Sequence, residues 1–152
     1  MKYYEEQRMN TWILILLIIT ILSPLIGIYS LIVYPSLTTP VWVLPLLIIL
    51  EGLLIFTLLN FYKLKIKVYR KHLVFSFGFF IRSFKSKNII SCKPVKIKFG
   101  DYLGIGIRLG WDGSIAFNTR FGNAVRIKIK KHRDYVLTSN NPRKLCKALK
   151  IR

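Results

Sequence analysis

The sequence predicts an α-helical transmembrane hairpin followed by a mainly-β domain of about seven antiparallel strands and a C-terminal helix. Residues 11–50 contain no Asp, Glu, Lys, Arg or His, whereas 23 of the 25 basic residues follow residue 62. Beyond that point apolar residues recur at every second position, which is the period of a strand with one buried face. We therefore divide the chain into residues 1–62, which hold the hairpin, and residues 63–152, the basic domain.

Two apolar stretches, at about residues 12–34 and 41–62, are long enough to cross a bilayer, which takes about 20 helical residues. The segment between them, residues 35–40, has two prolines and no charge, so we expect an antiparallel pair of helices. Glu5 and Glu6 offset the basic residues before the first stretch, and no small-residue cleavage site is evident. These features predict an uncleaved anchor rather than a signal peptide.

The charges that flank the two stretches predict their orientation. The connecting segment has neither Lys nor Arg, whereas Lys2 and Arg8 precede the first stretch and a lysine-rich segment follows the second. Cytoplasmic flanks of membrane helices carry the excess of basic residues. We therefore expect a multi-pass protein of the cell membrane with both termini in the cytoplasm.

One carboxylic acid, Glu51, falls near the middle of the second stretch, where an ionised side chain costs about 2.5 kcal/mol or more. A turn near Leu37 brings Ser23 to a similar depth, and Pro24 frees the carbonyl of Thr20. In one interpretation a neutral Glu51 donates a hydrogen bond to Ser23 or to that carbonyl and holds the hairpin together. In the other, Glu51 and Ser23 form an intramembrane polar site, as in a small transporter or channel-like subunit, or a contact between subunits.

Alternation of apolar and polar residues predicts the strands of the basic domain. Leu64, Ile66 and Val68 alternate with lysines, which gives one apolar and one cationic face. Turn residues separate this segment from others of the same kind. The predicted strands are residues 63–68, 73–77, 81–85, 95–99, 114–119, 125–129 and 135–139.

The end of the chain has a helical pattern. Asn141 offers an N-cap and Pro142 suits the first helical position. Apolar residues, including Leu145 and Leu149, then fall on one face.

The two cysteines are far apart in the sequence. Cys92 falls in an expected strand and Cys146 in the expected terminal helix, with no CxxC and no Cys/His cluster. We expect isolated structural thiols in a reducing compartment.

Seven strands followed by a helix resemble the pleckstrin-homology fold, and in particular the bacterial PH-like domains found behind one or two membrane helices. The most specific segment is Gly-Ile-Gly-Ile-Arg at residues 104–108, followed by Ala-Phe-Asn at 116–118 and by Gly122. The resemblance covers roughly residues 63–149. It implies an architecture and oligomeric assembly, but no substrate.

Five basic residues emerge directly after the second apolar stretch, where each is worth ~1 kcal/mol near an anionic membrane surface. We expect the domain to bind anionic lipid headgroups of the inner leaflet or a protein partner, and to self-associate through its helices or sheet edges. A merely solvated basic surface is the plain alternative. Nucleic-acid binding ranks last, because no nucleic-acid motif accompanies the charge. The five residues are Lys63, Lys65, Lys67, Arg70 and Lys71.

The sequence predicts no catalytic residues, no metal site and no cofactor. The glycines between residues 100 and 113 lack the GxxxxGK[ST] pattern of a phosphate-binding loop. His72 and His132 lie in separate turns, without metal-ligand spacing. Arg108 and Asn118 are the candidates for a small anion pocket, although structural hydrogen bonding explains them more simply. We therefore expect a non-enzymatic protein.

Overall fold

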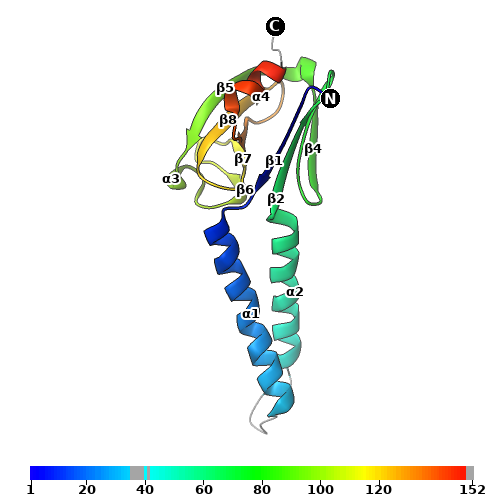
Figure 1. Ribbon diagram of the computed structural model, residues 1–152, viewed down its shortest axis with the longest axis vertical. Helices are drawn as coiled ribbons and strands as arrows, with labels where there is room; N and C mark the ends of the chain where they lie inside the picture. The colour runs from blue at the N-terminus through cyan, green and yellow to red at the C-terminus, as the bar shows by residue number, and fades with distance from the viewer. Residues whose placement is uncertain (35–39, 41, 150–152) are drawn as a thin grey trace. The chain divides into compact units, whose positions relative to one another are not determined.

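The computed structural model describes residues 1–34, 40 and 42–149 (Figure 1). The chain forms two compact units. One is Asn10–Asn60, and the other combines Met1–Met9 with Phe61–Arg152. The division predicted from the sequence, at residue 62, is therefore wrong for residues 1–9, which belong to the β domain although they precede the helices.

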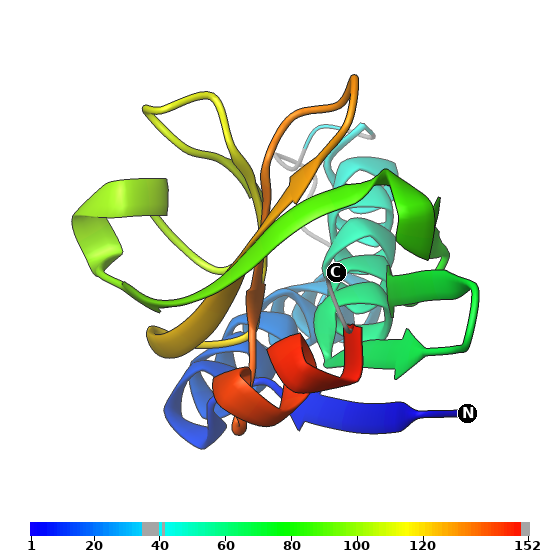
Figure 2. The same cartoon turned by 90° about the horizontal axis from the view of Figure 1, so that it is seen from above.

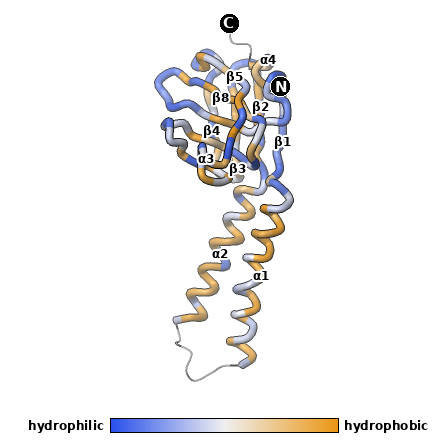
Figure 3. The backbone as a smooth tube through the Cα atoms, turned by 90° about the vertical axis from the view of Figure 1, so that its left-hand side faces the viewer, coloured by the Kyte–Doolittle hydropathy of each residue, from blue (hydrophilic) through white to orange (hydrophobic). Residues whose placement is uncertain are grey.

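The first unit contains two helices, α1 (Thr11–Val33) and α2 (Val43–Phe61), both long and apolar enough to cross a membrane. Figure 3 shows that hydrophobic residues dominate both. The predicted turn at residues 35–40 lies, apart from Pro40, outside the described residues. A Cβ on Gly27 would lie 3.8 Å from Leu47 Cδ1, so these two positions face each other in the antiparallel pair.

The second unit begins with a four-stranded antiparallel sheet in the order β1-β2-β3-β4. Its strands are β1 (Tyr3–Arg8), β2 (Lys63–Val68), β3 (His72–Phe77) and β4 (Phe80–Lys85). Strand β1 was not predicted, because its residues are mostly polar and lack the apolar alternation of the others. Arg8 is opposite Lys63 in the ladder, so the helical pair is inserted between two neighbouring strands of one sheet.

A five-stranded sheet follows in the order β5-β8-β9-β7-β6 (Figure 2). Strands β7 and β9 run parallel, so the prediction that all strands are antiparallel is wrong. After β7 the chain crosses to the far side of the sheet, where β8 pairs with β5. Strand β9 then fills the position between β7 and β8. The strands are β5 (Ile89–Ile97), β6 (Gly106–Leu109), β7 (Ile115–Asn118), β8 (Gly122–Ile129) and β9 (Tyr135–Thr138).

Each of the seven predicted strands overlaps an observed strand, and β6 is a second addition. The strand predicted at 95–99 is β5, which begins at Ile89 and ends at Ile97, and Phe99 lies in a helix instead. A short 3-10 helix, Ser86–Asn88, precedes β5, and the short helix α3 (Phe99–Tyr102) precedes β6. The predicted terminal helix is confirmed as α4 (Pro142–Leu149).

The core lies between the apolar faces of the two sheets. Phe75 and Phe117 meet edge to face with ring centroids 4.9 Å apart, and Phe77 stacks on Phe117. Leu145 and Leu149 of α4 are buried in the same cluster, as the helical pattern predicts. Burial of this apolar area is the main driving force for folding of the domain.

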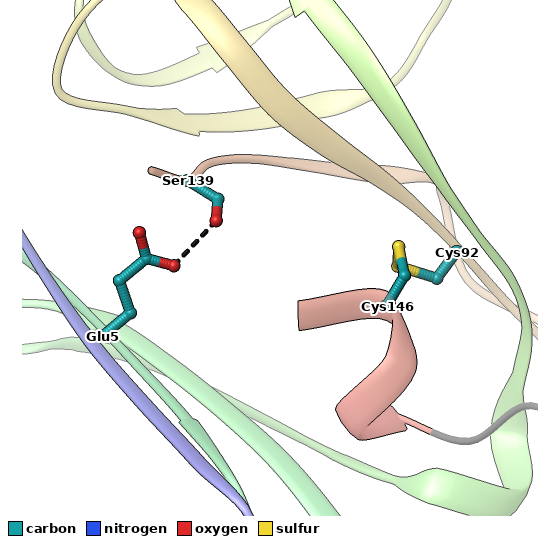
Figure 4. The surroundings of a disulfide bond; sticks show 4 residues. All are labelled: Glu5, Cys92, Ser139 and Cys146. Atoms are coloured by element: carbon teal, nitrogen blue, oxygen red, sulfur yellow. Dashed lines mark hydrogen bonds between the residues drawn. A yellow bond between two sulfur atoms is a disulfide. The ribbon is translucent and has the colours of Figure 1, made fainter. Parts of the chain in front are cut away.

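Cys92 in β5 and Cys146 in α4 form a disulfide, with Cα atoms 5.4 Å apart (Figure 4). The expectation of isolated thiols is therefore wrong. The two residues are 54 positions apart, and only the packing of α4 on β5 and β8 brings them together. The bond fastens α4 to the five-stranded sheet.

Candidate functional site

A group of exposed basic side chains in the β domain surrounds a cavity of about 500 Å³, which we call the basic cavity. Two segments form it, the turn from β2 to β3 and the end of β4 with the 3-10 helix that follows. No acidic residue is among its lining residues. They are Arg70, Lys71, His72, Lys85, Ser86 and Lys87.

Backbone hydrogen bonds hold these two segments together. His72 is opposite Lys85 in the β3–β4 ladder, and the N–H of Ser86 donates to the carbonyl of Lys71 at 2.8 Å. The basic side chains themselves are exposed. None of them forms an ion pair within the described residues, so their positive charges remain available to an anion.

The three lysines of β2 have a different setting. Lys63 Nζ lies 3.0 Å from Glu6 Oε1, and Lys67 Nζ lies 5.9 Å from the centre of the Tyr4 ring. The hydrogen bond from Lys63 is the largest cause of a lowered pKa at Glu6. Strand β1, which the sequence analysis missed, thus offsets part of this cationic face. Lys65 remains exposed.

The five predicted headgroup-binding residues therefore do not form a single cluster. Arg70 and Lys71 line the basic cavity, whereas the three lysines follow the length of β2. At about 3.3 Å per residue, Lys63 and Lys71 are roughly 20 Å apart along the sheet. Lys85 and Lys87 were missed as members of the basic cavity, because only the pairing of β3 with β4 brings them to the β2–β3 turn. His72 follows Lys71 in the chain and was expected only as a turn residue.

Arg108 and Asn118 are close together but both serve the backbone of one loop. Asn118 Nδ2 donates to the carbonyl of Gly104 at 2.9 Å, and Arg108 Nε donates to the carbonyl of Ile105 at 3.1 Å. The buried atom left without a partner is Asn118 Oδ1, which accepts hydrogen bonds and so disfavours an anion. The geometry supports a structural role over an anion pocket.

Glu51 is buried within the helical pair, 6% exposed, and neither carboxylate oxygen has a hydrogen-bond partner. The facing of Gly27 and Leu47 agrees with the expectation that Ser23 lies at a similar depth to Glu51. The predicted hydrogen bond from Glu51 to Ser23 or to the Thr20 carbonyl is nevertheless wrong. Equal depth alone does not bring the two groups within hydrogen-bonding distance.

A polar cluster around Asp112 in the β domain was not predicted from the sequence. Asp112 accepts hydrogen bonds from the N–H and the hydroxyl of Ser114 and from Arg126, and the Tyr102 hydroxyl lies 2.7 Å from Ser114 Oγ. These contacts, the hydroxyl of Ser114 above all, lower the pKa of Asp112 to about 2. The cluster ties α3 to β7 and β8. The sequence signal for it was the Asp-Gly-Ser turn at residues 112–114.

No group of three His, Cys, Asp or Glu side chains within the described residues is arranged to hold a metal ion. The chemistry of the site therefore amounts to exposed positive charge around the basic cavity.

Comparison with known proteins gives no match: no family model, no curated protein and no solved structure is similar to this chain.

Proposed function

We propose that this chain is a non-enzymatic membrane protein whose β domain binds anionic lipid headgroups in the basic cavity. The observation that carries the proposal is the convergence of Arg70, Lys71, Lys85 and Lys87 on one cavity without an acidic neighbour. Phosphate groups are bound by such clusters through charge-assisted hydrogen bonds. Two apolar helices keep the domain next to lipid, which raises the effective concentration of headgroups.

A PH-like architecture is part of the proposal. Two packed sheets and a terminal helix across β5 and β8 support it. The parallel pairing of β7 with β9 and the contribution of β1 from before the helices depart from the plain antiparallel pattern.

The proposal places both termini and the β domain on the cytoplasmic side. The pairing of β1 with β2 supports a common side for the two ends of the helical pair. The positive-inside rule favours the cytoplasm, whereas a disulfide favours an oxidising compartment. We give the charge distribution more weight, because every nearby Lys and Arg lies on one side of the pair.

The test uses the full chain in nanodiscs, with either neutral phosphatidylcholine alone or added phosphatidylserine. Amide hydrogen exchange is followed at residues 69–73 and 85–88. We expect protection of both segments only in the anionic nanodiscs, and loss of that protection in salt, because screening weakens exposed charge interactions. Equal exchange in the two lipids would reject the proposal.

Matched variants separate a bound headgroup from general attraction. Arg70→Gln with Lys71→Gln removes two charges from the basic cavity, and Lys144→Gln with Lys147→Gln removes two exposed charges from α4. We expect only the first pair to abolish the protection. If a soluble acidic protein protected the segments in neutral nanodiscs and anionic lipid did not, the occupant would be a protein partner instead.

A second candidate function rests on Glu51. A buried carboxylate without a hydrogen-bond partner in an apolar helix is costly, and such residues commonly mark proton or ion pathways. In proteoliposomes, a small transporter or channel-like subunit would show proton or ion flux that Glu51→Gln abolishes. The absence of flux in the unsubstituted protein would dismiss this candidate.

A further inference from the structure

A second cavity, of about 490 Å³, is mainly apolar and contains several aromatic rings. We call it the aromatic cavity. Its volume is within the roughly 300–1,000 Å³ range of small-molecule sites. It is lined by Phe61, Phe79, Phe80, Ile81, Arg82, Ile107, Ile115, Phe117 and Tyr135.

The cavity exists because the two sheets do not close upon each other at this edge. Strand β4 is the last strand of one sheet and β6 is the last strand of the other, and no ladder joins them. Phe117 and Tyr135 are almost fully buried and form the base. Phe61 and Phe80 stack with ring centroids 5.8 Å apart and form a wall.

Phe61 packs against Gly106, the first residue of β6. A Cβ at residue 106 would lie 3.4 Å from Phe61 Cδ1, and the backbone of Gly106 has φ +103°, a conformation that other residues rarely adopt. The ring of Phe61 is thereby seated against β6. Phe61 is also the last residue of α2, and it belongs to the compact unit of the β domain.

Arg82 is the one charged residue among those that line the aromatic cavity. Its side chain is exposed and forms no ion pair within the described residues. Ile81, beside it in β4, is 61% exposed. The site thus combines a mainly apolar lining with one positive charge that has no ion-pair partner among the described residues.

We propose that the aromatic cavity binds one hydrocarbon chain of an anionic amphiphile, with Arg82 paired to the negatively charged head group. The apolar lining suits the chain, and the charge of Arg82 complements the head group. The inference uses none of the residues of the basic cavity. It therefore stands or falls separately from the headgroup binding proposed above.

The test uses the full chain in phosphatidylcholine nanodiscs with a fatty acid that carries a photoreactive diazirine in its chain. After illumination, labelled residues are mapped by mass spectrometry. We expect labelling in β7 and β9 that excess unmodified fatty acid suppresses, whereas labelling of α1 and α2 from the bulk bilayer is not suppressed. Labelling confined to α1 and α2 would overturn the proposal.

Two variants and one control sharpen the result. Arg82→Gln should reduce the suppressible labelling about tenfold, the usual effect of losing one charge-assisted hydrogen bond. Ile115→Trp should block it by filling the cavity, and Arg143→Gln, which removes an exposed arginine of α4, should leave it unchanged. Equal labelling in the Arg82 and Arg143 variants would overturn the role of Arg82.

Discussion

The carboxylate of Glu5 in β1 accepts a hydrogen bond from Ser139 Oγ at 2.7 Å, across 134 positions of sequence (Figure 4). The Tyr3 hydroxyl, the Gln7 side chain and the N–H of Asn140 donate to the same carboxylate. Glu5 is only 7% exposed. The first residues of the chain are thereby anchored to the segment that leads into α4. In sequence, the two helices lie between these two parts of the chain.

Replacement of Glu5 by alanine should destabilise the β domain by about 3 kcal/mol or more, because several buried donors lose a charged acceptor. The measurement is chemical unfolding of the reconstituted protein, followed by amide exchange in β1 and α4. Glu6→Gln is the matched control. It removes a half-buried partner of Lys63 in a salt bridge that solvent screens, and should have a much smaller effect. Equal destabilisation by the two variants would contradict the anchoring role of Glu5.

Replacement of the helical pair by a tight turn should yield a soluble, folded domain. The N–H of Met9 donates to the carbonyl of Tyr62 at 2.9 Å, so Asn-Gly between these residues would form a two-residue β-hairpin. Residues 63–152 alone lack β1 and should aggregate, because the backbone N–H and C=O groups of β2 that pair with β1 are then exposed at a sheet edge. Size-exclusion chromatography and circular dichroism compare the two. A folded monomer of residues 63–152 would show that β1 is dispensable.

The contribution of Asp112 should depend on pH. Its pKa is lowered in the folded domain, to about 2 from 3.8, so its stabilising effect is complete above pH 4 and is lost as the pH falls toward 2. The side chain is 46% exposed, and solvent screening limits the effect to about 1 kcal/mol. Asp112→Asn should therefore unfold more easily than the unsubstituted protein at pH 7 and equally at pH 2. A gap in unfolding free energy that persists at pH 2 would point to another cause.

The disulfide should stabilise the attachment of α4. Cys146→Ser should lower the unfolding free energy by about 2–4 kcal/mol under oxidising conditions, since the bond closes a long loop in the unfolded chain. With a reductant present, the variant and the unsubstituted protein should become similar. The same difference with and without reductant would show that the thiols are not paired in the isolated protein.

Site-directed labelling can determine the side of the membrane. In a background of Cys92→Ser and Cys146→Ser, an impermeant maleimide should label Thr38→Cys in spheroplasts of an expression host. It should reach Lys87→Cys only after the membrane is opened, if the basic domain is cytoplasmic. The reverse pattern would place the domain in the compartment where disulfides persist, and the positive-inside prediction would then be wrong.

Several features were predictable because they depend on local sequence alone. The two helices follow from forty positions without a charged residue, and α4 follows from Asn141, Pro142 and the spacing of Leu145 and Leu149. The seven predicted strands follow from alternation, which a half-buried strand requires whatever its neighbours are. Arg70 and Lys71 were likewise singled out by charge and position, before the cavity that they line was known.

The sequence by itself therefore determined the two apolar helices, the basic β domain and its terminal helix. Only the tertiary structure decided that β1 belongs to that domain, that β9 lies parallel to β7, that Cys92 meets Cys146, and that Lys85 and Lys87 join the basic cavity. Each of these depends on contacts between residues that are distant in the chain. Local periodicity specifies which face of a strand or helix is buried, but it does not specify which partner covers that face.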